Sequence, residues 1–151
     1  MDAVRLAGTT RRAYVPIMFH QRAESPLRLS GLDQASRFFA GCLAETDQAI
    51  EHLWVAHVDD DARCLHLTRH DGDADGADFP IRDIIVDAVR HCSKGIILAH
   101  NHPSGDPAPS TADTRITRRL ALVGEAMDVA ILDHLVLAGT ECRSMRQMGL
   151  L

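Results

Sequence analysis

Two apolar runs in the second half of the chain restrict its fold more than any other feature of the sequence. Residues 96–99 read IILA, and residues 129–139 read VAILDHLVLAG. Runs of this kind are typical of strands that are buried on both faces of a sheet. The segment between them repeats apolar residues at helical spacing, at Ile116, Leu120, Val123 and Met127. A strand, a helix and a second strand in this order predict a sheet that is covered by helices.

The first half of the chain predicts a helix followed by a β-hairpin. The helix is expected to run from Leu32 to about Glu45, because apolar residues recur there at helical spacing. The hairpin is expected from two strand patterns, EHLWVAHV and RCLHLTR, on either side of a turn at residues 59–61. Alternation along the first strand would place one set of side chains on one face, namely Leu53, Val55 and the stem of His57. The other face would carry Trp54, Ala56 and Val58.

The remaining segments complete an α/β pattern. Composition predicts a loop over residues 70–78, and Pro80 suits the first turn of a helix whose apolar stripe ends at Cys92. Gly95 would punctuate the end of that helix, and residues 141–151 would add a short strand or a last turn. The expected fold class is therefore α/β (α+β), with a mixed β-sheet flanked by helices.

Length and composition indicate one domain behind an N-terminal arm. Residues 1–29 show no sustained period and are interpreted as an arm that is free to move, whereas residues 30–151 are expected to form the domain. The formal net charge of −5 argues against general affinity for nucleic acid, which needs a basic surface. The four cysteines form no C-x-x-C pair, so reduced thiols in a cytoplasmic protein are expected. The apolar stretch AYVPIMF is short and broken by Pro16, so neither a signal peptide nor a membrane span is predicted.

The polar loop that follows the IILA run carries the clearest chemical signal. His100 and His102 stand one residue apart at the end of the expected strand, so their side chains point the same way. Asp113 follows eleven residues after His102, in the first turn of the next helix. Two imidazoles and one carboxylate suit zinc and leave the fourth tetrahedral position for water, whose pKa falls to about 7 on the metal. Three prolines restrict the loop and lower the entropy that is lost when the ligands converge.

Each part of this pattern also has a simpler interpretation. The residues STAD, from Ser110 to Asp113, form a capping-box sequence, and for that pair alone helix capping is favoured over catalysis. Ser104 and Asp106 are expected to make turns within the loop. An isolated H-x-H is weak, because histidines are common in polar surface loops. The combination of both histidines, the seven-residue gap and S-x-x-D is far more specific, and a capping serine can also direct its hydroxyl toward a metal.

The joint pattern H-x-H, seven residues, S-x-x-D resembles the signature of the JAMM (MPN-type) metalloproteases. More narrowly, the segment ILAHNHPSGDPAPSTADTRITRRL and the later LDHLVLAG resemble the RadC family of bacterial JAMM-fold proteins, from about Glu51 to the C-terminus. The resemblance implies a three-layer JAMM architecture related to that of cytidine deaminases. RadC proteins usually also carry an N-terminal helix-hairpin-helix region, and the upstream part of this sequence is too short to hold it fully.

The same resemblance implies roles for single residues of this chain. The ligands of one zinc ion would be His100, His102 and Asp113. Ser110 would donate a hydrogen bond to the developing oxyanion. Glu51, near the start of the first core strand, would act as the general base and later protonate the leaving amine. An exposed charge at the strand edge is an equally supported interpretation of Glu51, and Glu45 is the alternative base.

Three functions follow as alternatives. The first is a zinc-dependent peptidase or isopeptidase that acts on a peptide or a protein conjugate. The second is a DNA-associated repair accessory protein, with contacts from a basic cluster that is otherwise interpreted as a solvated helix face, namely Arg115, Arg118 and Arg119. The third is a metal-binding scaffold without turnover. His134 is expected to hydrogen-bond within the fold, with support of a metal ligand as the alternative.

Overall fold

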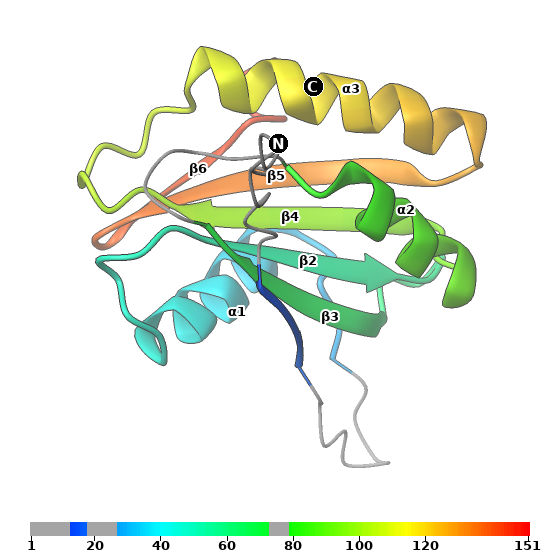
Figure 1. The fold of residues 1–151 in the computed structure, drawn as a ribbon, viewed down its shortest axis with the longest axis horizontal. Helices are drawn as coiled ribbons and strands as arrows, with labels where there is room; N and C mark the ends of the chain where they lie inside the picture. The colour runs from blue at the N-terminus through cyan, green and yellow to red at the C-terminus, as the bar shows by residue number, and fades with distance from the viewer. Residues whose placement is uncertain (1–12, 18–26, 73–78) are drawn as a thin grey trace, which may run out of the picture.

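The centre of the molecule is a six-stranded mixed sheet. A computed structural model describes residues 13–17, 27–72 and 79–151 (Figure 1). Within them, the strand order is β1-β3-β2-β4-β5-β6, where β4 and β5 run parallel and the other neighbours run antiparallel. The strands are β1 (Ala13–Ile17), β2 (His52–Val58), β3 (Cys64–Asp71), β4 (Gly95–Asn101), β5 (Ala130–Ala138) and β6 (Glu141–Ser144). The mixed α/β sheet that the sequence predicts is confirmed.

Helices cover both faces of this sheet and give three layers. Helix α1 (Leu32–Ala44) lies on one face, and α2 (Ile81–Arg90) and α3 (Thr111–Ala126) lie on the other (Figure 1). Phe39 of α1 packs in one core with alternate residues of the strands, and Leu120 of α3 packs in a second core on the opposite side. In the described part of the chain, no helix is both long and apolar enough to cross a membrane.

Strand β2 shows why the central segments read as continuous apolar runs. All seven of its residues are buried, because it lies between β3 and β4 and is covered on both faces. Leu53 and Val55 face the core beneath α2 and α3. The opposite core, beneath α1, receives Trp54, Ala56 and Val58. The predicted division of side chains along this strand is confirmed.

Strand β1 lies within the interval that the sequence indicates as an arm. Its backbone pairs antiparallel with β3, from Ala13 opposite Asp71 to Ile17 opposite Leu67. As the outermost strand it can contain Pro16, because an edge strand leaves one side of its backbone unpaired. A short edge strand that contains proline gives no sustained periodicity, which is why the sequence pattern did not indicate it. The rest of that interval up to residue 26 lies outside the described residues.

Helix α2 ends at Arg90, the left-handed residue that follows it is Cys92, and the prediction that Gly95 ends the helix is wrong. Cys92 has a φ of 51°, and the amides of Ser93 and Cys92 donate to the carbonyls of Ala88 and Val89 at 2.9 and 3.2 Å. These two bonds form a Schellman motif, which glycine usually completes. Gly95 instead begins β4, where a Cβ atom would lie only 2.7 Å from the Leu132 side chain.

Replacing Cys92 with glycine is expected to raise the free energy of unfolding by about 0.5–1 kcal/mol. A left-handed conformation costs an L-residue about 1–2 kcal/mol, and the greater freedom of glycine in the unfolded chain cancels part of the gain. Urea denaturation would measure the change. Cys92→Ala keeps the Cβ atom and serves as the control, so an equal gain in both variants would contradict the explanation.

The four cysteines are free thiols, in agreement with their spacing in the sequence. Burial raises the pKa of Cys42 to about 12. It also raises the pKa of Cys64 and of Cys142 to about 11. Because the thiolate is the reactive form, these three side chains are poor nucleophiles near neutral pH.

A group of histidines lies between the β2–β3 hairpin and the end of α2. His57 is 0% exposed and its Nδ1 lies 3.1 Å from Ser93 Oγ, while its Nε2 has no hydrogen-bond partner among the residues that the structure describes. The ring of His66 stacks on that of His91 at a centroid distance of 4.0 Å. Burial, together with the charges of His66, His91 and His70, lowers the pKa of His57 to about 3. His57 is therefore neutral in the folded protein near pH 7.

The free energy of unfolding is expected to fall as the pH is lowered from about 6.5 toward 3. Over this range the unfolded chain binds a proton at His57 that the folded chain does not bind, so protonation favours unfolding. The loss approaches about 1.4 kcal/mol per pH unit for this group alone. Urea titrations between pH 7 and pH 4.5 would measure it. His57→Gln should reduce this slope by up to about 1.4 kcal/mol per pH unit, which is the contribution of one proton. An unchanged slope in that variant would contradict the assignment.

Candidate metal centre

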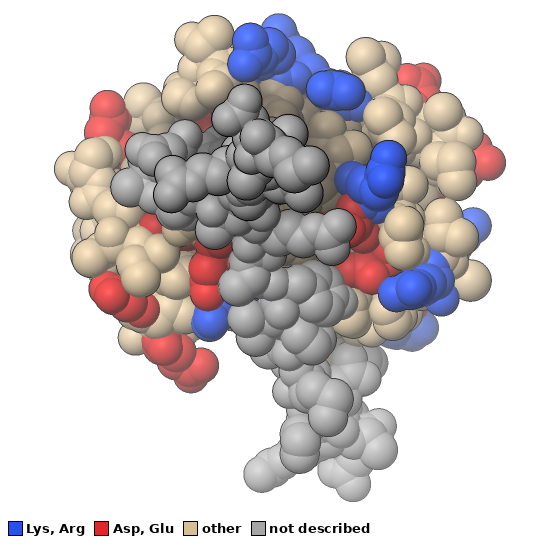
Figure 2. All heavy atoms as spheres, viewed as in Figure 1, with Lys and Arg blue, Asp and Glu red and all other residues tan. Residues whose placement is uncertain are grey.

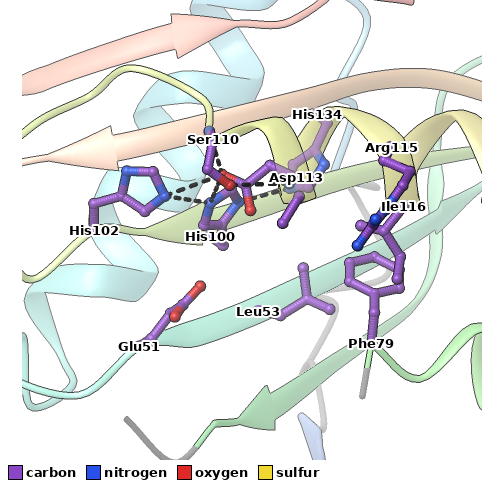
Figure 3. Close-up of a pocket in the computed structure, with 11 residues that line it drawn as sticks. Glu51, Leu53, Phe79, His100, His102, Ser110, Asp113, Arg115, Ile116 and His134 are labelled. Atoms are coloured by element: carbon purple, nitrogen blue, oxygen red, sulfur yellow. Dashed lines mark hydrogen bonds and ion pairs between the residues drawn. The ribbon is translucent and has the colours of Figure 1, made fainter. Parts of the chain in front are cut away.

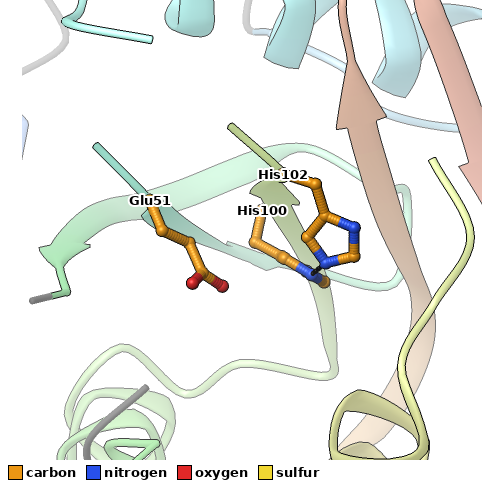
Figure 4. A group of neighbouring side chains, drawn as sticks. All are labelled: Glu51, His100 and His102. Atoms are coloured by element: carbon orange, nitrogen blue, oxygen red, sulfur yellow. Dashed lines mark hydrogen bonds between the residues drawn. The ribbon is translucent and has the colours of Figure 1, made fainter. Parts of the chain in front are cut away.

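Two histidines converge at the carboxyl end of β4. His100 is 3% exposed and lies on the face of β4 that carries Leu98, beneath α3, whereas His102 follows the strand. The Nε2 atoms of the two rings are 2.8 Å apart (Figure 4). The alternation expected from H-x-H at the end of a strand therefore brings both imidazoles to one point.

A helix cap brings the carboxylate of Asp113 to the same point. Ser110 is the N-cap of α3: its Oγ accepts from the Asp113 amide at 3.0 Å, and its own amide donates to Asp113 Oδ2 at 2.8 Å. The capping box that the sequence suggests is confirmed. The same Oδ2 lies 3.3 Å from His100 Nε2 and 3.2 Å from His102 Nε2 (Figure 3). The cap therefore fixes the carboxylate as the third corner of a triangle with the two rings.

The hydrogen bond of His102 Nδ1 determines which ring nitrogen of His102 carries the lone pair. Nδ1 of His102 is 2.8 Å from the carbonyl oxygen of Asp106, which can only accept a hydrogen bond, so Nδ1 carries the proton. In the neutral ring, Nε2 then presents a lone pair toward His100 and Asp113. The turn of the loop creates this contact, because Ser104 Oγ and the Asp106 carboxylate each accept a backbone amide, as predicted for these residues.

The carboxylate and the two ring nitrogens of the triangle favour a positive charge between them. The hydrogen bond to Asp113 raises the pKa of His102 against the opposing effect of burial. Burial alone would raise the pKa of Asp113, but the adjacent rings of His100 and His102 outweigh burial and hold this pKa well below its ordinary value. An anionic carboxylate and two ring nitrogens thus stabilise a cation between them, either a proton or a metal ion.

The dimensions of the triangle fit zinc. Ligand atoms that lie 2.0–2.2 Å from a tetrahedral zinc ion are about 3.3–3.6 Å apart. The two distances to Asp113, 3.2 and 3.3 Å, are close to this spacing, whereas the two Nε2 atoms, 2.8 Å apart, would have to separate by about 0.5 Å to bind zinc. Two imidazoles and one carboxylate also match the ligands that borderline divalent ions prefer, and three protein ligands leave one tetrahedral position open.

Glu51 reaches this centre from the neighbouring strand. Strand β2 pairs with β4 so that Leu53 lies opposite His100, and Glu51 comes directly before β2, two residues from Leu53. Ligand atoms of Glu51, His100 and His102 all lie within 4.8 Å of one another (Figure 4). Asp113 Oδ2 lies 3.2–3.3 Å from a nitrogen of each ring, so both carboxylates lie close to the two histidines. Glu45 is the exposed C-cap residue of α1 and does not line the pocket described next.

The triangle forms one wall of a pocket of about 390 Å³. Ser110 and Glu51 also line the pocket, and the remaining surface is largely apolar (Figure 3). Leu53, Phe79 and Ile116 supply that apolar surface, with Arg115 beside them. Sequence patterns gave no signal for Phe79, which enters the pocket only because α2 packs against the sheet next to α3. The pocket thus combines a wall of two imidazoles and a carboxylate with a largely apolar surface.

The three arginines of α3 have separate environments. Arg115 lines the pocket, whereas Arg118 donates from Nε to the carbonyl of Leu150 at 2.9 Å. Arg119 is exposed. On the face seen in Figure 2, basic side chains gather over α3, and acidic side chains lie on the same face. Contact with DNA through this cluster stays a prediction.

Comparison with known proteins identifies the family. Residues 29–150 match the sequence model of the family described as "RadC-like JAB domain". The chain belongs to this RadC-like JAB domain family. A RadC-like domain was expected from the residues around the metal-ligand pattern, and that expectation is confirmed.

Relatives of this RadC-like domain carry the name UPF0758 protein. One from Chloroflexus aurantiacus is 37% identical over 101 residues, which cover 66% of this chain and 44% of the relative. One from Bordetella petrii is 33% identical over 144 residues, or 93% of this chain and 60% of the relative. One from Symbiobacterium thermophilum is 47% identical over 70 residues, or 46% of this chain and 30% of the relative. The chain thus spans about half the length of the curated relatives that it matches.

Other histidines of the RadC-like domain lie outside the triangle. His52 is held between Asp71 Oδ1 at 2.6 Å and the Asp47 carbonyl at 2.8 Å. His70 lies 3.2 Å from Thr68 Oγ1 on β3. His134, by contrast, contacts His100 directly, and burial lowers its pKa well below the ordinary value, so that it is neutral. The expectation that the hairpin histidines do not converge on the main motif agrees with these contacts.

Proposed function

We propose that this RadC-like domain is a zinc-dependent hydrolase of amide bonds of the JAMM class, acting on a peptide or a protein conjugate. The observation that carries the proposal is the triangle of His100, His102 and Asp113, with the Glu51 carboxylate beside it in one pocket. Zinc, when bound by these three residues, would polarise the scissile carbonyl and lower the pKa of water to about 7.

Glu51 would supply the proton transfers of the reaction. Hydrolysis adds the oxygen of water to the carbonyl carbon, breaks the C–N bond and places one proton on the leaving amine. A carboxylate within hydrogen-bond reach can accept the proton of the attacking water and then donate it to that nitrogen. The position of Glu51, close to both histidines and lining the pocket, supports this assignment over Glu45.

Ser110 would stabilise the oxygen of the tetrahedral intermediate. Its Oγ accepts the Asp113 amide as a helix cap, which leaves the hydroxyl hydrogen available for donation into the pocket. Capping and donation to an oxyanion therefore use different parts of the same hydroxyl group. The rigid cap would hold this donor in place before the substrate binds, which is the condition for effective transition-state stabilisation.

Metal content and peptide hydrolysis test the proposal together. Purified chain would be dialysed, loaded with zinc, freed of excess metal and analysed by plasma mass spectrometry, with an expected stoichiometry of one zinc per chain. The loaded protein would then be incubated with pools of short peptides and of isopeptide-linked lysine peptides, with cleavage read by mass spectrometry and blocked by a chelator. One zinc per chain without cleavage would favour the metal-binding scaffold, and no retained zinc would overturn the proposal.

A further inference from the structure

A row of buried polar side chains extends from His100 away from the pocket. Nδ1 of His100 lies 2.7 Å from His134 Nε2 on the adjacent strand β5. Nδ1 of His134 lies 2.7 Å from Thr117 Oγ1 on α3, and this hydroxyl donates to the Asp113 carbonyl at 2.7 Å. His134 and Thr117 are 1% and 0% exposed, so water does not compete for these bonds. The row therefore links three elements of the fold to one ring of the triangle.

The positions of the protons in this row can be deduced from its last acceptor, the carbonyl oxygen of Asp113. The Asp113 carbonyl can only accept, so it takes the single hydroxyl hydrogen of Thr117. Thr117 Oγ1 must then accept the Nδ1 proton of His134. Burial of His134, which is 1% exposed, favours the neutral ring, and that ring has no second proton, so its Nε2 accepts from Nδ1 of His100. His100 is left with a lone pair on Nε2, the atom that faces His102 and Asp113.

We infer that His134 and Thr117 are positioning residues that fix His100 in the tautomer able to bind a metal ion through Nε2. This inference rests on the proposed function, because it assigns the two residues to a metal ligand. A carbonyl or a carboxylate, the usual partners of a metal-bound histidine, can only accept a hydrogen bond. A histidine partner can donate or accept, so the direction of the bond must be imposed from elsewhere. In this chain, Thr117 imposes it.

His102 shows the simpler alternative within the same site. Its Nδ1 donates directly to the Asp106 carbonyl, so one backbone atom is sufficient to determine its tautomer. His100 projects toward α3 from the buried strand β4, where neighbouring carbonyls are used by the sheet, so its partner is a side chain. Loss of the Thr117 hydroxyl would allow His134 to move its proton to Nε2 and donate to His100. His100 would then carry its proton on Nε2, in the position required for the metal.

Zinc affinity of a Thr117→Val variant tests the inference. Valine has nearly the shape of threonine but lacks the hydroxyl, and zinc would be titrated against a chromophoric chelator. We expect the dissociation constant for zinc to rise by about 10- to 100-fold, the range typical when the partner of a metal-binding histidine is removed. Thr117→Ser restores the hydroxyl and is expected to remain within about threefold of the wild type.

Thr114→Val is the matched control. Thr114 also lies in α3 and donates to the carbonyl four residues before it, that of Ser110 at 3.2 Å, but it does not contact His134 in the described structure. It is expected to bind zinc as the wild type does. Equal affinity of Thr117→Val and wild type, or equal weakening by Thr114→Val, would overturn the inference. Circular dichroism spectra would establish that each variant is folded before titration.

Long-range ¹H–¹⁵N NMR spectra of the imidazoles give a second readout in the wild-type chain without metal. Protonated Nδ1 on both His100 and His134 is expected, and a proton on Nε2 of His134 would overturn the inference whatever the variants do. Failure of the proposed function has a different signature. Wild type would then retain no zinc, while the proton positions on His100 and His134 would still decide whether the row has the stated direction.

Discussion

Zinc is expected to raise the unfolding temperature of this chain by about 10 °C or more. A ligand that binds only the folded state stabilises it by about 4 kcal/mol when its free concentration is a thousand times its dissociation constant. For a domain of this size, 1 kcal/mol corresponds to roughly 3–5 °C. The triangle of two ring nitrogens and one carboxylate gives the physical reason, because three such atoms that lie 2.8–3.3 Å apart need little rearrangement to surround a cation. Differential scanning fluorimetry with zinc and then with EDTA would measure the shift and its reversal.

Two variants identify the source of this shift. Asp113→Asn can still accept the Ser110 amide through its side-chain oxygen, so the helix cap is kept while the anionic ligand is lost. Most of the zinc-dependent shift should disappear in this variant. Asp106→Asn removes a carboxylate from the same loop but keeps the backbone carbonyl that holds His102, and it should retain the full shift. A full shift in Asp113→Asn would exclude Asp113 as a ligand.

The second large effect is expected at Glu51. Once a cleavable peptide is found, zinc-loaded Glu51→Gln is expected to hydrolyse it about 10²–10⁴ times more slowly than the wild type, the usual contribution of a positioned acid–base group. Zinc stoichiometry should not change, because the proposed ligands are His100, His102 and Asp113. Rates would be measured on the same peptide with metal content determined in parallel.

Glu45→Gln is the control for this experiment. Glu45 is the alternative base suggested by the sequence, and its exposed position at the end of α1 predicts an unchanged rate. A slow Glu45→Gln with a normal Glu51→Gln would reverse the assignment of the base. Loss of zinc from Glu51→Gln would instead identify Glu51 as a ligand, which its distance to both rings allows.

The fold explains how a short chain assembles such a site. The parallel pair β4 and β5 requires a crossover, and α3 provides it directly after the loop that carries His102. The N-terminus of α3 therefore lies next to the carboxyl end of β4, where His100 is located. One loop connection thus supplies all three proposed ligands, one at the end of a strand, one in the loop and one at a helix cap. The sheet and α3 form a rigid support, which keeps these ligands close before a metal binds.

The sequence by itself determined the features that depend on neighbouring residues. The division of β2 into Leu53 and Val55 on one face and Trp54 on the other follows from the alternation of any strand, and the helix cap of Ser110 and Asp113 follows from S-x-x-D. His100, His102 and Asp113 lie within one strand–loop–helix segment, so their spacing alone was enough to predict their convergence.

Only the tertiary structure decided the features that depend on strand pairing. Glu51 reaches the site because β2 pairs with β4 in a register that no local pattern specifies, which is why the sequence left Glu45 as an alternative. The partnership of His134 and Thr117 with His100 requires β5 beside β4 and α3 above them. Strand β1 lies where the sequence predicted an arm, and the left-handed residue after α2 is Cys92, where the sequence predicted that Gly95 would end the helix. In each case, contacts between segments distant in the sequence, or the packing at an element's end, outweighed the weak local preference.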